Sequence, residues 1–124
     1  MIIDCISDLH GFYPEDPELL GGDLLIVAGD LTEIDTLSDH SDFINFLNKL
    51  NYKKKVLIAG NHDNFLQRNK NFYEESNITF LCDSATEFEY EEVVEEEHKF
   101  KGMISYNVKK KLKIWGSPWS LWFL

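Results

Sequence analysis

The sequence predicts an α/β fold in which the first strands form a parallel sheet. Three short apolar runs, at residues 2–6, 24–28 and 56–59, are bounded by Gly, Asp or Asn. Runs of this length between turn residues are typical of strands buried on both faces of a sheet. A stretch with helical periodicity separates the second run from the third, and the order strand, helix, strand favours parallel pairing.

The stretch between those two runs, SDHSDFINFLNKLN at residues 38–51, is predicted to be a helix. Ser38 and Asp39 stand at its start and are the candidate capping residues. His40 falls in the first turn and is expected to be exposed. The apolar residues that follow the helical spacing are Phe43, Phe46, Leu47 and Leu50.

The second half of the chain is expected to change from buried to solvent-facing structure. A short helix over about residues 64–73 and a strand at residues 78–82 are predicted first. A glutamate-rich segment, residues 87–97, then precedes a lysine-rich one, residues 99–113, and both alternate charged with apolar residues. This alternation predicts antiparallel strands whose acidic and basic faces pair across a hairpin. A solvated sheet edge is favoured over a binding site for a charged partner.

The length and charge exclude several classes of protein. At 124 residues, 44% of them hydrophobic, residues 1–124 are expected to form a single domain. The net charge of -10 repels phosphate backbones and anionic membranes, so nucleic-acid binding through a basic surface is not expected. With no membrane span or signal sequence evident, a cytoplasmic protein is expected, in which Cys5 and Cys82 are buried and reduced.

A polar cluster follows each predicted buried strand: SDLHG at residues 7–11, GDLT at residues 29–32 and GNHD at residues 60–63. The carboxyl ends of neighbouring parallel strands lie on one edge of a sheet, where ligands collect. Side chains from all three clusters are therefore expected to converge. They are Asp8, His10, Asp30, Asn61 and His62.

These residue types suit a centre with two metal ions. Asp8 and His10, two apart in an extended segment, are expected to hold one ion, and Asp30 has two oxygens that can bridge both. Asn61 offers an amide oxygen to the second ion. Two ions about 3.5 to 4 Å apart activate a bridging water and stabilise the attacking and leaving oxygens of a phosphoryl transfer. His62 is unsuited to the same ion as Asn61 and is expected to steady the phosphate or protonate the leaving group.

Each cluster alone is more common as a turn or a helix cap, and their joint occurrence after three strands favours a metal site. Gly29 and Gly60 are expected to let the backbone turn sharply close to the metals.

SDLHG, GDLT and GNHD resemble the opening motifs of the calcineurin-like metallophosphoesterases. IWGSPWS, residues 114–120, resembles the metallophosphoesterase-domain-containing subgroup near the class III cyclic-nucleotide phosphodiesterases. The resemblance implies a partial four-layered αββα sandwich, with a mixed sheet whose N-terminal strands are parallel. It also implies hydrolysis of small phosphomono- or phosphodiesters with Mn, Fe, Zn, Ni or Mg. The metal roles that it implies fall on Asp8, His10, Asp30 and Asn61, and the catalytic role falls on His62.

The sequence departs from the family pattern after the Gly-Ser-Pro segment. Family members continue to further histidines that complete both metal shells, and this sequence ends at Leu124, before them. His98, in EEEHKF, lacks the strand end or glycine of the family pattern and is not expected to be a ligand. The resemblance therefore implies two ions in the family, one or none here, and a weakened hydrolysis by a metal-activated hydroxide.

Two alternatives belong to other functional classes. The chain is also interpreted as a non-catalytic fragment or descendant that forms homo-oligomers or binds a protein through its apolar end, WSLWFL at residues 119–124. A nucleotide-binding α/β module is disfavoured, because no Gly-rich phosphate loop follows any strand.

Overall fold

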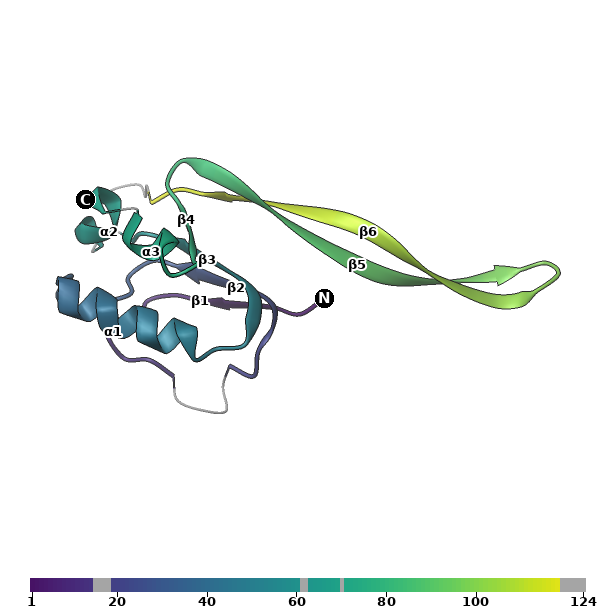
Figure 1. Ribbon diagram of the computed structural model, residues 1–124, viewed down its shortest axis with the longest axis horizontal. Helices are drawn as coiled ribbons and strands as arrows, with labels where there is room; N and C mark the ends of the chain where they lie inside the picture. The colour runs from purple at the N-terminus through teal and green to yellow at the C-terminus, as the bar shows by residue number, and fades with distance from the viewer. Residues whose placement is uncertain (15–18, 61–62, 70, 119–124) are drawn as a thin grey trace, which may run out of the picture.

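A computed structural model describes residues 1–14, 19–60, 63–69 and 71–118, which form two sheets (Figure 1). The first is a parallel sheet of four strands, and the second is an antiparallel ribbon of two long strands that extends away from it. The predicted α/β class and the parallel N-terminal strands are confirmed, and the antiparallel strands form a sheet of their own. Among the described residues, no helix is long and apolar enough to cross a bilayer.

The parallel sheet brings the ends of its strands to one edge. The strands lie side by side in the order β1-β2-β3-β4, and they span Ile3–Ile6, Gly22–Ala28, Tyr52–Ile58 and Thr79–Leu81. Ile6 pairs with Val27, and Ala28 pairs with Ile58, so β1, β2 and β3 end at neighbouring positions. The polar clusters that follow them therefore start next to one another.

The edge strand β1 is more exposed than the sequence predicts. Ile3 and Cys5 of β1 are exposed, whereas Leu24 and Leu25 of β2 are fully buried. No residue of β1 is among the buried members of either apolar cluster in the described part of the chain, so the prediction of burial on both faces is wrong for β1. Cys5 is exposed and Cys82 is half-buried, so the prediction that both are buried is wrong; both are free thiols, as predicted.

Helix α1, Leu37–Asn48, starts earlier than its predicted caps. Its N-cap is Thr36, whose hydroxyl oxygen accepts a hydrogen bond from the Asp39 backbone N–H at 3.2 Å. The prediction of Ser38 or Asp39 as the cap is wrong, because both residues lie inside the helix. The predicted helix at residues 64–73 is divided into two short helices, α2 at Asn64–Arg68 and α3 at Asn71–Glu74.

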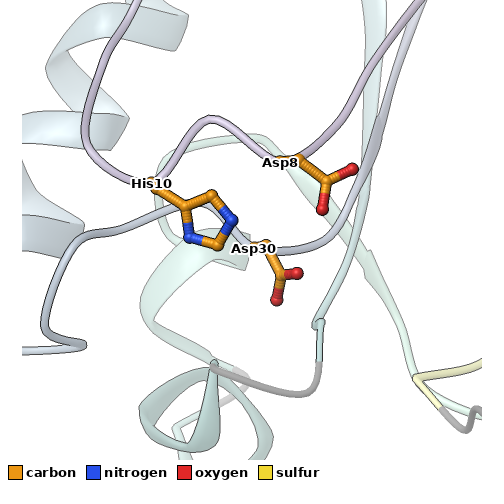
Figure 2. A group of neighbouring side chains, drawn as sticks. All are labelled: Asp8, His10 and Asp30. Carbon is orange, nitrogen blue, oxygen red and sulfur yellow. The ribbon is translucent and has the colours of Figure 1, made fainter.

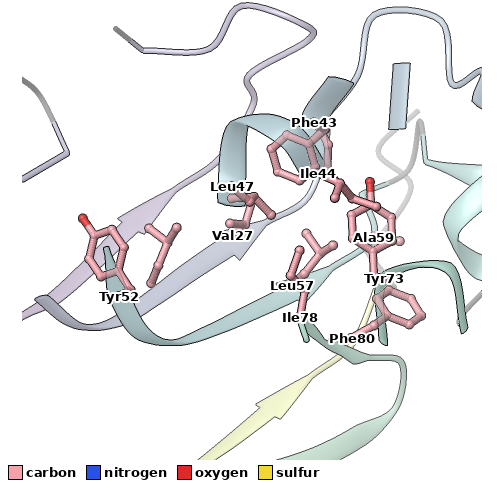
Figure 3. Close-up of a cluster of buried hydrophobic side chains, with 12 residues drawn as sticks. Val27, Phe43, Ile44, Leu47, Tyr52, Leu57, Ala59, Tyr73, Ile78 and Phe80 are labelled. Carbon is pink, nitrogen blue, oxygen red and sulfur yellow. The ribbon is translucent and has the colours of Figure 1, made fainter. Parts of the chain in front are cut away.

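The main core lies between α1 and the parallel sheet (Figure 3). Phe43 and Leu47 of α1 are fully buried in it together with Leu57 of β3. Leu31 and Ala59 also belong to this core, and they lie just beyond the ends of β2 and β3. The other buried members are Leu25, Val27, Ile44, Tyr52, Tyr73, Ile78 and Phe80. Burying one such large side chain contributes about 1.5–3 kcal/mol, so the core anchors the segments that carry the polar clusters.

The antiparallel ribbon consists of β5, Ser84–His98, and β6, Gly102–Gly116. The predicted pairing of acidic with basic residues across it is confirmed. For example, Lys110 Nζ lies 2.5 Å from Glu92 Oε2, and both side chains are exposed. Exposed pairs of this kind contribute little to the free energy of unfolding.

The base of the ribbon is the part that packs on the parallel sheet. Leu112 and Ile114 contact a second apolar cluster, made of Leu24, Val56 and Leu81. His98 lies at the far end of the ribbon, where its Nδ1 accepts a hydrogen bond from the Lys101 backbone N–H at 3.2 Å (Figure 1). The apolar segment WSLWFL at residues 119–124 lies outside the described residues.

Two glycines let the segments after β2 and β3 approach each other closely. Gly29 has a φ of +83°, and a Cβ on it would lie 2.6 Å from the Gly60 Cα. A Cβ on Gly60 would overlap the Asp30 Oδ1. The sharp turn expected at Gly29 is confirmed, and both positions require glycine.

We expect Gly29→Ala to destabilise the fold more than Gly11→Ala. Gly11 has a similar φ of +85°, but its nearest neighbour is a side-chain atom, Glu33 Cβ at 3.2 Å. Gly11→Ala should lower the free energy of unfolding by the left-handed backbone cost of about 1–2 kcal/mol. Gly29→Ala should lower the free energy of unfolding by a further ~1–3 kcal/mol, because its Cβ would clash with backbone atoms. Urea unfolding followed by circular dichroism measures both, and equal losses would show that the close approach of Gly29 to Gly60 is wrong.

Candidate metal centre

The site is built from three loops at the carboxyl edge of the parallel sheet. The first loop, residues 7–11, follows β1, and the second loop, residues 29–36, follows β2. The third loop follows β3, and its described residues are 59, 60 and 63. Backbone hydrogen bonds join the first loop to the second: Asp8 N–H donates to Gly29 O at 3.2 Å, and His10 N–H donates to Asp30 O at 3.0 Å. The parallel pairing of β1 with β2 therefore continues past the strand ends.

These bonds bring together three of the predicted ligands (Figure 2). Asp8, His10 and Asp30 each offer one ligand atom, and these atoms all lie within 4.8 Å of one another. Asp8 and His10 are exposed, and Asp30 is half-buried. The other two predicted site residues, Asn61 and His62, lie outside the described residues.

The backbone at all three residues adopts the left-handed region. The φ angles are 55° for Asp8, 48° for His10 and 53° for Asp30. The prediction that Asp8 and His10 lie in an extended segment is therefore wrong: the chain turns at each of them. Residues other than glycine enter this region at a cost, and such residues gather where a function requires their geometry.

The residues near Asp8 and Asp30 constrain their carboxylates. The Ser7 hydroxyl donates a hydrogen bond to Asp8 Oδ2 at 2.7 Å. On the other side of the site, the Gly60 Cα stands so close to Asp30 that any side chain at residue 60 would collide with the Asp30 carboxylate. The third loop therefore contacts the ligand contributed by the second loop.

The donor set fits a divalent metal ion. Two atoms that bind one ion at about 2.0–2.2 Å lie at most about 4.4 Å apart. Ligand atoms that already lie within 4.8 Å of one another need only a small side-chain rotation to reach this spacing. Two carboxylates and an imidazole bind ions such as Mn, Fe, Zn and Ni.

Two buried polar residues beside these loops were not predicted from the sequence. His40 is fully buried, so the prediction that it is exposed is wrong: it lies between Asp35 and Tyr73, which bond to its two ring nitrogens. Asp63, the last residue of GNHD, is also fully buried and accepts backbone hydrogen bonds. Asp63 stands between Asn61–His62 and a short predicted helix, and nothing in this pattern indicates that its carboxylate is buried.

The chain was compared with known proteins. The family model described as calcineurin-like phosphoesterase matches residues 1–117. The chain belongs to the calcineurin-like phosphoesterase family. The parallel sheet and the separate antiparallel sheet are consistent with the metallophosphoesterase fold. The family generally uses divalent metal ions, in agreement with the group of Asp8, His10 and Asp30.

Curated relatives agree with this assignment. Human metallophosphoesterase domain-containing protein 1 is 31% identical over 126 residues, which cover 96% of this chain and 37% of that protein. UPF0046 protein C25E10.12 of Caenorhabditis elegans is 31% identical over 133 residues, covering 93% of this chain and 40% of that protein. A protein of Emericella nidulans, named probable rhamnogalacturonate lyase C, is 45% identical over 65 residues, covering 52% of this chain and 6% of that protein. The chain thus spans two fifths or less of the length of each of these relatives.

Two tyrosines with raised pKa values predict how the stability of the fold depends on pH. Burial raises the pKa of Tyr13 from 10.0 to about 12, and the negative charges of Asp39, Asp42 and Asp63 add to this effect. Burial also raises the pKa of Tyr73. Below pH 10 both the folded and the unfolded chain keep these protons; between pH 10 and 12 only the unfolded chain loses them, so the free energy of unfolding must fall.

Urea unfolding at about pH 9 and about pH 11.5 measures this dependence. We expect the midpoint of the wild-type chain to fall between the two, and that of Tyr13→Phe to fall less, because one ionisable hydroxyl is gone. An equal fall in both chains would contradict the raised pKa of Tyr13.

Proposed function

We propose that this chain hydrolyses small phosphomono- or phosphodiesters with divalent ions held by Asp8, His10 and Asp30. The observation that supports this proposal is the convergence of these three side chains, from two adjacent loops, in a member of the phosphoesterase family. Asn61 as a ligand of the second ion and His62 as the catalytic residue belong to the same proposal, and both lie outside the described residues.

The charge of the site explains why metal ions are needed. A phosphate ester is an anion, the chain has a net charge of -10, and two of the three convergent side chains are carboxylates. Without cations, the substrate would be repelled. Bound divalent ions supply the positive charge and lower the pKa of a bound water.

The side chains have separate tasks in this proposal. A carboxylate has two oxygens, so Asp30 would hold a second ion as well as the first. The Asp8 carboxylate is oriented by the Ser7 hydroxyl. His62 would steady the phosphate or donate a proton to the leaving oxygen. The left-handed backbone turns at Asp8 and Asp30 fix these residues before the substrate binds. The entropy cost of ordering them during the reaction is therefore smaller.

Several finer predictions remain part of this proposal. They are manganese as the preferred ion, phosphodiesterase activity, weakened turnover, a cytoplasmic location and a single domain over residues 1–124. The expectation of one ion or none in this chain is the alternative to this proposal. Homo-oligomer formation through residues 119–124 also stays a prediction, because these residues lie outside the described part of the chain.

Binding of Mn²⁺ and hydrolysis of bis(p-nitrophenyl) phosphate test the proposal. We expect Asp30→Asn and Asp8→Asn to weaken Mn²⁺ binding at least ten-fold and to reduce turnover with it, because each removes a carboxylate from the centre. Isothermal titration calorimetry measures the affinity, and nitrophenolate absorbance measures the rate.

Asp23→Asn is the matched control. Asp23 lies at the opposite end of β2, where its carboxylate accepts hydrogen bonds from Lys53 Nζ at 2.6 Å and from the Ile2 backbone N–H at 2.8 Å. This variant should bind Mn²⁺ as the wild type does. A wild-type chain that binds no Mn²⁺ at millimolar concentration, or an Asp30→Asn variant that binds it as tightly as Asp23→Asn, would disprove the proposed site.

A further inference from the structure

A buried carboxylate of the third loop is bonded to the backbone of the second loop. Asp63 is fully buried, and its Oδ2 accepts hydrogen bonds from the Asp30 N–H at 2.7 Å and the Gly60 N–H at 2.6 Å. Its Oδ1 accepts a third from the Leu31 N–H at 3.1 Å. One side chain therefore binds the backbone of the candidate ligand Asp30, the residue after it, and the glycine that contacts the Asp30 carboxylate.

A second carboxylate makes the reverse connection, from the second loop to the segment after the third. Asp35 Oδ2 accepts a hydrogen bond from the Phe65 N–H at 2.8 Å, at the start of α2. Its Oδ1 lies 2.7 Å from the His40 Nε2, and the His40 Nδ1 lies 2.6 Å from the Tyr73 hydroxyl. A carboxylate only accepts, so the Nε2 of His40 carries the hydrogen and holds Asp35 in place.

The chemistry of these partners requires an acceptor with two oxygens. All three groups around Asp63 are backbone donors. Asparagine has almost the same shape, but its amide nitrogen is a donor, and it would face at least one of these N–H groups. A buried N–H without an acceptor is costly, so the backbone at Asp30 or Leu31 would move.

We propose that Asp63 is a positioning residue that holds Asp30 in the geometry needed for metal binding, and that Asp35 reinforces this connection from the other loop. The inference rests on the proposed metal site and adds two residues that do not touch the ion. Asp63 is suited to this task because it binds the N–H of Asp30 itself, where φ is 53°, and it is two residues along the chain from Asn61. One carboxylate thus links the backbone of Asp30 in the second loop to Gly60 in the third. Partners that orient metal ligands typically change metal affinity by about 10–100-fold when they are removed.

The test compares Asp63→Asn and Asp35→Asn with Leu47→Ala. Leu47 of α1 is fully buried in the main core. Its truncation should therefore destabilise the fold without removing a hydrogen bond to the loops. Two quantities are measured below the unfolding transition of each variant: amide hydrogen exchange in the metal-free chain by nuclear magnetic resonance, and Mn²⁺ affinity by calorimetry. The urea midpoint gives the stability of each variant.

In Asp63→Asn we expect faster exchange at Asp30, Leu31 and Gly60, and Mn²⁺ binding weakened by about ten-fold or more. In Asp35→Asn the faster exchange should fall on Phe65, with a smaller loss of affinity. Leu47→Ala should lower the urea midpoint while Mn²⁺ affinity stays at the wild-type value. A purely structural role for Asp63 predicts instead that its variant behaves like Leu47→Ala.

The inference fails if Asp63→Asn binds Mn²⁺ as tightly as the wild type, or if the three amides exchange at wild-type rates in it. Failure of the proposed function gives a different result. In that case the wild-type chain binds no Mn²⁺, while the three amides are still protected by Asp63 and lose protection in Asp63→Asn. Loss of amide protection without Mn²⁺ binding would support the hydrogen bonds from Asp63 to the second loop, and it would contradict a role of Asp63 in metal binding.

Discussion

The parallel pairing of β1 with β2 is the interaction on which the candidate site depends. It continues beyond the strand ends through the bonds from Asp8 N–H to Gly29 O and from His10 N–H to Asp30 O. Because of this continuation, Asp8 and His10 lie beside Asp30, which comes about 20 positions later in the chain. No side-chain contact is needed to bring them together. The order of strands in the sheet therefore decides which side chains can share an ion.

The loops at this edge carry backbone strain that the rest of the fold must offset. Asp8, His10 and Asp30 all have positive φ, at a cost of order 1 kcal/mol or more each. The core under α1 includes Leu31 and Ala59, which anchor the second and third loops from below. Asp63 satisfies the backbone donors that the turn at Asp30 leaves inside the protein. Packing and buried hydrogen bonds thus fix a geometry that the ligand residues would not adopt alone.

Some of this arrangement could be predicted from the sequence, and the reasons for the rest are physical. Short apolar runs and the helical spacing of Phe43 and Leu47 depend on local periodicity, so the parallel strands and α1 were predictable. The convergence of Asp8, His10 and Asp30 followed from strand order. The burial of His40 was not predictable, because it depends on its contacts with Asp35 and with Tyr73, which is 33 residues away in sequence. The exposure of β1 depends on which side chains cover its faces, and the turns at Asp8 and His10 depend on the neighbouring loop.

The central claim is that Asp8, His10 and Asp30 bind a common divalent ion. The most direct measurement is a crystal structure of the chain grown with Mn²⁺, with data collected for anomalous scattering. We expect an anomalous peak at about 2.0–2.3 Å from a ligand atom of each of the three side chains. Crystals that contain Mn²⁺ and show no peak there, or that show the three side chains pointing to separate regions, would contradict it.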